Sequence, residues 1–288
     1  MSFSKVTLVG GHGFIGRHLQ KRFSRKGLEV SVVGAGDETW MDTSLGLVVW
    51  AAGYTKDYAA RPDLTVAAHA GDLAKLVQRA GYEALVYLSS TRLYDGLEGT
   101  VNEDTPLALG SSAPRHLFDL SKALGEHLVR HHGGPRAHVA RLSGVYANEL
   151  DGGSFVEEMM AQALSGNGKE VETPPDAARD YIHMDDVAEA IWAIGERGMH
   201  PVYNVASGEL VDNRVLLGLL SERAGVPIFP ALPPSGQTFP LIDITRMKQT
   251  LDVHPMAFSE GLDRVMVHQD NLKAMQSMMG VTKMPWMM

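Results

Sequence analysis

Residues 5–16 read Lys5-Val6-Thr7-Leu8-Val9-Gly10-Gly11-His12-Gly13-Phe14-Ile15-Gly16, and this stretch decides the fold. A strand-like run is followed at once by glycines in G-x-x-G-x-x-G spacing and then by a predicted helix over Arg17–Lys26. The first glycine of such a loop permits a tight turn, the second lets a pyrophosphate approach the backbone, and the third lets the helix pack on the sheet. The helix start points free N–H groups at an anion. The context favours a dinucleotide-binding loop over a turn that binds nothing.

Composition limits the class of protein. A chain of 288 residues, with 44% hydrophobic and 21% charged residues, fits a soluble α/β domain with room for a smaller companion. The net charge of −8 argues against nucleic acid as a partner. The absence of cysteine excludes disulfides and thiolate metal sites. The first strand begins too early for a signal peptide, and the apolar runs are only strand-length, so we expect a cytoplasmic protein without a membrane partner.

Strand-like and helix-like segments alternate through the first half of the chain. The predicted strands are 5–9, 30–33, 45–52, 84–89 and 137–142, and the predicted helices between them are 17–26, 65–79 and 117–131. This alternation predicts a Rossmann-type doubly wound parallel sheet. The segment 22–47 is short, so we expect one crossover to lack a proper helix.

Glycine and proline become more frequent after about residue 145, which predicts a smaller, irregular lobe. We assign residues 1–145 to the dinucleotide-binding domain, with 180–206 returning to it. Residues 146–179 and 207–288 form the predicted substrate-binding lobe. Helices are expected at 155–165, 185–196 and 214–224.

Ligands of doubly wound folds bind beyond the carboxyl ends of the strands. Two such ends stand out, Ala51-Ala52-Gly53 and Ser89-Ser90-Thr91. The first has the small side chains that a closely approaching cofactor requires, and the second places hydroxyl groups at the same edge. Leu120-Ser121-Lys122-Ala123 lies on a predicted helix that crosses this crevice.

From about residue 5 to 212 the chain resembles the extended short-chain dehydrogenase/reductase family of nucleotide-sugar epimerases, dehydratases and 4-ketoreductases. The motifs that carry the resemblance are 10–16 (GGHGFIG), 51–55 (AAGYT), 89–94 (SSTRLY), Ser121-Lys122 with Glu126, 141–146 (RLSGVY), 179–186 (RDYIHMDD) and 203–208 (YNVASG). The shortened second crossover is most similar to the smaller 4-keto-sugar reductases. The resemblance implies hydride transfer at a keto or hydroxyl carbon of a nucleotide-linked sugar.

The family's catalytic set is a serine or threonine, a tyrosine and a lysine in Tyr-x-x-x-Lys spacing. Position by position, the hydroxyl is Ser90 and the lysine is Lys122, but the tyrosine position holds Phe118. In the family the tyrosine exchanges a proton with the substrate oxygen, and the lysine lowers its pKa and binds the cofactor ribose. Phenylalanine retains the ring and lacks the proton.

Three explanations of Phe118 stay open at this point. It is an engineered Tyr→Phe change that traps a complex, or a native residue in an enzyme that draws the proton from Tyr94, Thr91 or a water held by Ser90. In the third explanation the protein is a redox-silent NAD(P)-binding regulator or sensor.

The resemblance also implies the ligand contacts. The expected cofactor-binding residues are Gly10, His12, Gly13, Phe14, Ile15, Gly16, Asp42, Ala51, Ala52, Gly53, Ser89 and Lys122. Position 34, after the second strand, holds glycine where NAD enzymes carry an acid, and Asp37 comes three residues late, so we expect NADP, with NAD as the alternative. His12 and Arg17 are candidates for a 2′-phosphate, or solvated surface residues.

Thr91, Arg92, Tyr94 and Arg179 are the expected substrate residues. Arg179 matches the family's diphosphate-binding arginine, unless it pairs structurally with Asp180 or Asp176. We expect no metal site, because the histidines of helix 117–131 lack an accompanying acid or cysteine. In relatives, helices equivalent to 65–79 and 117–131 pair as a four-helix bundle, which predicts a homodimer.

Overall fold

The centre of the fold is a six-stranded parallel sheet. A computed structural model describes residues 3–34, 38–55, 57–79 and 81–278. Its strands run in the order β10-β6-β4-β3-β1-β2, and every neighbouring pair is parallel. They are β1 (Lys5–Val9), β2 (Glu29–Val33), β3 (Leu47–Trp50), β4 (Ala84–Ser90), β6 (Ala137–Leu142) and β10 (Val202–Val205). The predicted doubly wound parallel sheet is confirmed.

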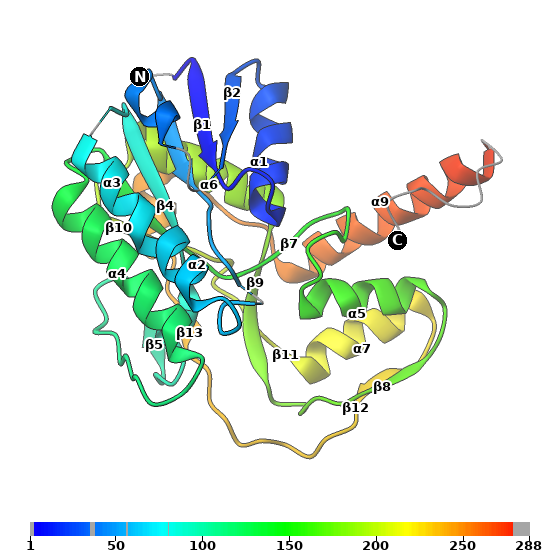
Figure 1. Ribbon diagram of the computed structural model, residues 1–288. Coiled ribbons are helices and arrows are strands. Elements are labelled where there is room, and N and C mark those ends of the chain that lie inside the picture. The colour runs from blue at the N-terminus through cyan, green and yellow to red at the C-terminus, as the bar shows by residue number, and fades with distance from the viewer. Residues whose placement is uncertain (1–2, 35–37, 56, 80, 279–288) are drawn as a thin grey trace.

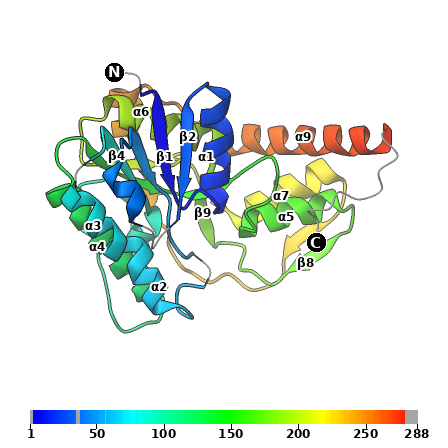
Figure 2. The same cartoon turned by 45° about the horizontal axis from the view of Figure 1, so that its top comes forward.

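Helices cover both faces of this sheet (Figures 1 and 2). One face carries α1 (Phe14–Arg25) and α6 (Met184–Arg197), and the other carries α3 (Asp72–Arg79) and α4 (His116–His132). Strands buried on both faces need apolar cover on each side. Leu19 and Ile191 belong to one buried cluster, and Leu73 and Val129 belong to the other.

The connections between strands differ in regularity. Between β2 and β3 the described residues contain only η1 (Thr39–Asp42), a 3₁₀ turn, as the short segment predicts. The predicted helix 65–79 is interrupted: α2 (Pro62–Val66) passes through η2 (Ala67–Gly71), a π-helical turn, into α3. After β4 the chain forms η3 (Thr91–Tyr94).

The smaller lobe has its own apolar core. It contains α5 (Phe155–Leu164), α7 (Asn213–Ala224) and the paired strands β8 (Lys169–Val171) and β12 (Ile228–Pro230). A three-stranded sheet of β7 (Gly144–Tyr146), β9 (Ala178–His183) and β11 (Leu210–Asp212) connects it to the main domain. The long helix α9 (Phe258–Met278) packs its first turns on this core and then projects from the body (Figure 1).

One segment departs from the predicted domain division. Residues 207–288 are expected in the smaller lobe, yet β13 (Leu241–Ile242) pairs with β5 (Thr100–Val101) beside the main sheet. The following helix, α8 (Thr245–Leu251), buries Met247 and Leu251 in the main core. The segment returns because these apolar side chains fit against α6. No helix in the described part of the chain is long and apolar enough to span a membrane.

Candidate active site

The glycine loop combines close packing with one open position. A Cβ on Gly10, whose φ is +82°, would lie 2.6 Å from the Ala52 backbone, and one on Gly16 would lie 2.4 Å from the Gly10 carbonyl oxygen. Both therefore require glycine. Gly13 has an ordinary φ of −72°, and a Cβ there would come no closer than 3.4 Å to another residue. Gly13 thus leaves space for a ligand at the start of α1.

Gly13 opens into the smaller of two neighbouring cavities, which we name the glycine-loop cavity. Its volume is about 300 Å³. The predicted residues that line it are Gly13, Phe14, Ile15, Ala51, Gly53, Ser89, Ser90, Phe118 and Lys122. The strand ends that supply several of them meet because the strands are parallel and in register, with Ser90 beside Leu142. The structure therefore brings most of the predicted cofactor residues together.

Other predicted cofactor residues lie outside this cavity. Gly10, Gly16 and Ala52 hold the loop against the sheet instead of lining the space. His12 is exposed on the loop, and Asp42 is exposed at the end of η1. Asp37 lies outside the described residues.

Lys122 is the charged group of the glycine-loop cavity. Its side chain is buried, and Nζ donates a 2.8 Å hydrogen bond to the Leu88 carbonyl oxygen and lies 5.0 Å from the centre of the Tyr87 ring. Burial lowers the pKa of Lys122 to about 7, because desolvation disfavours the ammonium form. The lysine is therefore able to hold or release a proton near neutral pH.

Phe118 is buried in a shell of rings and charge. Its ring lies 5.4 Å from the His69 ring in an edge-to-face contact and 5.6 Å from the Tyr58 ring. The Arg92 guanidinium carbon lies 4.7 Å from the Phe118 ring centre, which is a cation–π distance. Phe118 therefore lies between the glycine-loop cavity and Arg92, and its side chain has no hydroxyl group that could donate a proton.

The second cavity, which we name the arginine cavity, has a volume of about 650 Å³. It contains the guanidinium-bearing residues Arg92, Arg115 and Arg179, and Thr91 also lines it. Arg115 is neutralised, since it bonds both Asp95 and Asp119. Arg92 and Arg179 make no ion pair with any carboxylate in the described residues. Two cationic groups are therefore available to an anionic ligand.

The surroundings of Arg179 test the structural pairing that was considered for it. Its guanidinium stacks 4.3 Å from the Phe239 ring centre and donates to the Ala178 carbonyl oxygen at 2.8 Å. Asp180 instead accepts hydrogen bonds from the backbone N–H groups of residues 207–209. Asp176 accepts from the backbone of residues 235 and 236. The structural pairing considered for Arg179 does not occur.

The two cavities meet at a row of hydroxyl groups. The residues that line both are Thr55, Ser90, Ser143 and Ser154. Ser90 Oγ accepts a 3.2 Å hydrogen bond from the Arg92 backbone N–H, so its own hydrogen remains available to a ligand oxygen. The junction therefore presents donors to an oxygen atom held between the cavities.

Tyr94 is not brought to the site. It is fully buried and lines neither cavity. Its hydroxyl bonds Asn204 Oδ1 at 2.9 Å and accepts from Arg141 at 2.6 Å. Arg141, on the inner strand β6, also forms a bidentate ion pair with Glu126 of α4, and both side chains are buried. Tyr94 therefore helps to hold this ion pair, and the structure does not place it to exchange a proton with a substrate.

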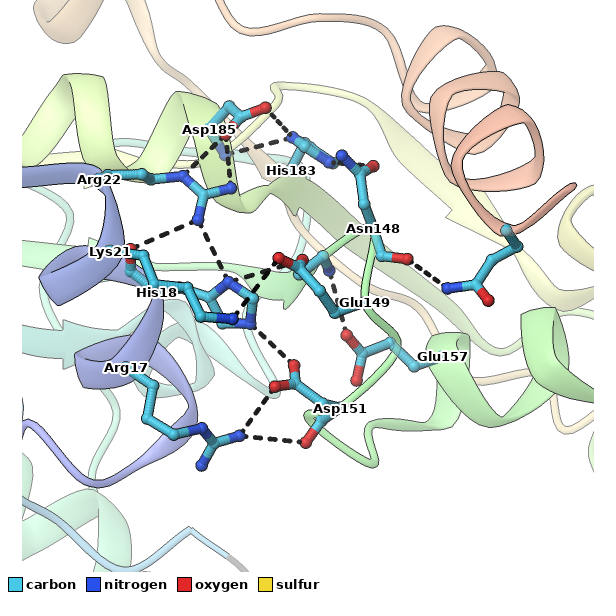
Figure 3. Close-up of polar contacts among 12 residues, drawn as sticks. Arg17, His18, Lys21, Arg22, Asn148, Glu149, Asp151, Glu157, His183 and Asp185 are labelled. Carbon is cyan, nitrogen blue, oxygen red and sulfur yellow. Dashed lines mark hydrogen bonds and ion pairs between the residues drawn. The ribbon is translucent and has the colours of Figure 1, made fainter. Parts of the chain in front are cut away.

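A polar network fixes the loop that lines the other side of the junction (Figure 3). Asp151 accepts from Arg17 at 3.0 Å and from His18 at 2.8 Å, which ties residues 148–151 to α1. The following residues, Gly152 and Ser154, line the glycine-loop cavity. Arg17 is thus engaged by a carboxylate in this structure, which the sequence pattern alone did not reveal.

Several lining residues were not predicted. Ser154 carries a detectable signal, because Ser154 and Glu157 form a capping box at the start of α5. His69 packs against Phe118 without lining either cavity, and its contact with Ser121 gave no such signal in the amphipathic pattern of the two helices. That contact joins η2 to α4 and depends on tertiary packing.

The chain belongs to the NAD dependent epimerase/dehydratase family, whose sequence profile matches residues 6–206. It is 27% identical over 203 residues to a dTDP-4-dehydro-6-deoxy-D-allose reductase from Streptomyces sp, a match that spans 67% of this chain and 62% of that protein. A dTDP-glucose 4,6-dehydratase from Streptomyces griseus is 30% identical over 152 residues, or 51% of this chain and 45% of the relative.

Solved structures share the fold. The UDP-glucose 4-epimerase of Thermotoga maritima superposes with a TM-score of 0.79 at 19% identity, covering 93% of this chain and 99% of the epimerase. MoeE5, solved with UDP-glucuronic acid and NAD, gives a TM-score of 0.78 at 18% identity, with the same coverage. At this identity the likeness establishes architecture and leaves the choice of ligand to the residues of the site.

Proposed function

We propose that the protein is an NAD(P)-dependent oxidoreductase or epimerase that acts at a keto or hydroxyl carbon of a nucleotide-linked sugar. The observation that carries the proposal is the row of hydroxyl groups between the two cavities. One cavity adjoins a dinucleotide-binding loop and a buried lysine, and the other holds two arginines without carboxylate partners. A sugar carbon at the junction of the two cavities has a hydride donor on the glycine-loop side, while the arginine side binds the anionic part of the same substrate. The relatives named above act on dTDP-sugars, which supports the same substrate class.

The residues of the junction have distinct proposed roles. Ser90 donates a hydrogen bond to the substrate oxygen and stabilises the developing alkoxide. Lys122 holds a positive charge or a proton beside the cofactor. Arg179 binds the diphosphate, and Arg92 binds the sugar end. A bound nicotinamide dinucleotide supplies the hydride, and the open face of Gly13 fits its pyrophosphate.

NADP is the proposed cofactor, with NAD as the alternative. Gly34 follows β2 without a carboxylate that would repel a 2′-phosphate. Of the two predicted phosphate ligands, His12 is exposed, whereas Arg17 is held by Asp151. Titration with NADPH and NADH tests the choice: we expect tighter NADPH binding that His12→Ala weakens. Equal affinities for NADPH and NADH would show that the site does not prefer NADP over NAD.

The second candidate function is a redox-silent NAD(P)-binding regulator, and Phe118 is the observation that favours it. Single-turnover oxidation of bound NADPH by a nucleotide 4-keto sugar separates the two. Any first-order loss of NADPH that Ser90→Ala abolishes supports the oxidoreductase. Tight binding of both ligands without NADPH loss, in this protein and in Phe118→Tyr, supports the regulator.

We also propose a homodimer through α2 and α4. Leu64, Val66, Leu120 and Leu124 expose 41–48% of their surface on these adjacent helices. Ala70 and Val77, on the predicted helix 65–79, are buried within the monomer. Sedimentation equilibrium is expected to show a 62 kDa species, about twice the 31.3 kDa chain, and Leu124→Glu to reduce it to the monomer. A 31.3 kDa species for the unaltered protein at micromolar concentration would reject the dimer.

A further inference from the structure

His69 is a buried polar residue that packs beside Phe118. It lies in the π-helical turn η2, and its side chain is fully buried. Such turns insert one extra residue into a helix and are frequent at functional sites. Here the turn directs the His69 ring edge-on to Phe118, at a centroid distance of 5.4 Å.

The contacts of Ser121 are the basis on which we assign the tautomer of His69. Ser121 Oγ donates its single hydrogen to the Phe118 carbonyl oxygen at 3.1 Å, and it lies 2.8 Å from His69 Nδ1. With its one hydrogen on that carbonyl, Ser121 accepts from His69, and we therefore assign the proton of the ring to Nδ1. Burial and the nearby charge of Lys122 lower the pKa of His69 to about 2, so the ring is neutral. The Nε2 atom is therefore a bare acceptor.

This acceptor has no hydrogen-bond partner among the described residues, although it is buried. A buried polar atom without a partner is uncommon in native proteins and needs an explanation. Gly53 packs closely on this atom: a Cβ on that residue would lie 2.7 Å from His69 Nε2 and 3.4 Å from Lys122 Nζ. Gly53 and Lys122 both line the glycine-loop cavity.

The side of Gly53 on which a side chain would stand is thus flanked by an acceptor, His69 Nε2, and by a cationic donor, Lys122 Nζ. Lys122 Nζ uses one of its three hydrogens on Leu88 and has others to give. An O–H group satisfies both neighbours at once, since it donates to Nε2 and accepts from Nζ. A carbonyl or a carboxylate would leave Nε2 unpaired, and an ammonium would meet the Lys122 charge.

We propose that His69 is a positioning residue of the cofactor site, whose Nε2 accepts a hydrogen bond from the ribose hydroxyl to which Lys122 donates. The proposal rests on the dinucleotide binding proposed above. It concerns the ribose next to the reactive base, since Lys122 and Phe118 line the cavity together with Ser90, where the reacting carbon is proposed to lie. A water molecule offers the same O–H chemistry, so the experiment must separate the two sources.

The test measures the affinities of NADPH, ADP-ribose and ADP for the whole protein and for His69→Phe, which retains the ring and removes the acceptor. ADP-ribose carries the second ribose and ADP lacks it. We expect His69→Phe to weaken the binding of NADPH and of ADP-ribose about tenfold and to change the affinity for ADP by no more than about twofold. His69→Asn, which keeps an acceptor, is expected to recover part of the loss. His127→Phe, at an exposed histidine of α4, is the matched control.

The outcomes separate this proposal from the proposed function. If the unaltered protein binds no dinucleotide, the proposed function fails. The other outcomes concern a protein that binds NADPH. If His69→Phe then binds NADPH equally well, or if its affinity for ADP falls by the same factor as its affinity for NADPH, only the role of His69 is overturned. Water or packing then explains why Nε2 has no protein partner. If the variants do not fold, ¹⁵N NMR of the unaltered protein decides. Addition of ADP-ribose must shift the bare Nε2 resonance of His69, and an unchanged resonance would overturn the proposal.

Discussion

The glycine-loop cavity and the arginine cavity are built from different kinds of sequence. The first is lined largely by residues at or just after the ends of strands, close together in the sequence, such as Ala51 with Gly53 and residues 88–90. The second draws on residues scattered from Thr55 to Ile242, and many come from the irregular lobe. Contiguous motifs at strand ends can be found in one sequence, because parallel strands bring their carboxyl ends to one edge. A cavity assembled from distant loops offers no such rule.

The two cavities also differ in how they handle charge. Lys122 is buried in the glycine-loop cavity, where desolvation works against its charge. Arg92 and Arg179 are partly exposed and stack on aromatic rings, so their charges remain available. The difference suits a positioning task in the glycine-loop cavity and recognition of an anion in the arginine cavity.

The largest expected effect is at the boundary between the cavities, at Phe118. If Phe118 stands where the reaction needs a phenol, Phe118→Tyr is expected to raise the rate of NADPH oxidation by a nucleotide 4-keto sugar by roughly 10²–10⁴-fold. Ser90→Ala and Lys122→Met are each expected to remove most of that gain, because the three groups act as a unit. Single-turnover absorbance is the measurement.

Phe229→Tyr is the matched control, since it adds the same hydroxyl to a half-exposed ring that lines neither cavity. Substantial turnover by the Phe118 protein, unimproved by tyrosine, would reject a trapped enzyme and assign the proton to another donor. Tyr94 is a poor candidate for that donor, because its hydroxyl is already bound to Asn204 and Arg141.

A smaller effect is expected within the arginine cavity. Arg179→Gln should weaken UDP or dTDP binding by about thirtyfold, the range for losing a hydrogen bond to a charged group. Arg92→Gln should leave nucleoside diphosphate affinity within about twofold while weakening the complete nucleotide sugar. Isothermal titration with both ligands checks this division. The reverse pattern would place the diphosphate at the Phe118 end.

Only part of the fold and of the site can be predicted from the sequence alone. The sheet, the glycine loop and the positions of Ser90 and Lys122 follow from local pattern, and the structure brings them together as predicted. The positions of Tyr94, Arg17 and His69 do not follow. Each depends on a partner far away in the chain, respectively Asn204, Asp151 and Ser121. No hydrophobic period or motif spacing encodes those pairings.

The glycine loop gives a prediction that separates ligand binding from folding. Gly13→Val places a side chain where the pyrophosphate is expected, in a backbone conformation that valine tolerates. NADPH affinity should fall at least about tenfold while the melting temperature stays close to that of the unaltered protein. Gly218→Val on α7, where a Cβ would meet nothing within 4 Å, is the control. Unchanged affinity in a folded Gly13→Val protein would disprove the assignment of this loop.

The smallest expected effect is the pH dependence of stability that Lys122 contributes to the unliganded protein. Burial lowers the pKa of Lys122 from its ordinary 10.5 to about 7. Between these values the unfolded chain binds more protons than the folded one, so the contribution of Lys122 to stability rises as the pH increases from about 7 to 10 and is unfavourable below that window.

Lys122→Met removes this titration and retains an apolar side chain. The melting temperature of the unaltered protein relative to Lys122→Met should therefore rise by a few degrees between pH 7.5 and 9.5, as measured by thermal denaturation at both values. Lys75→Met, at a partly exposed lysine of α3 paired with Glu38, is the control and should show no such rise, because the pKa of Lys75 is raised rather than lowered. A difference that stays flat with pH would mean that Lys122 remains charged in the folded protein. Its ammonium would then be a permanent hydrogen-bond donor in the glycine-loop cavity, unable to exchange a proton near neutral pH.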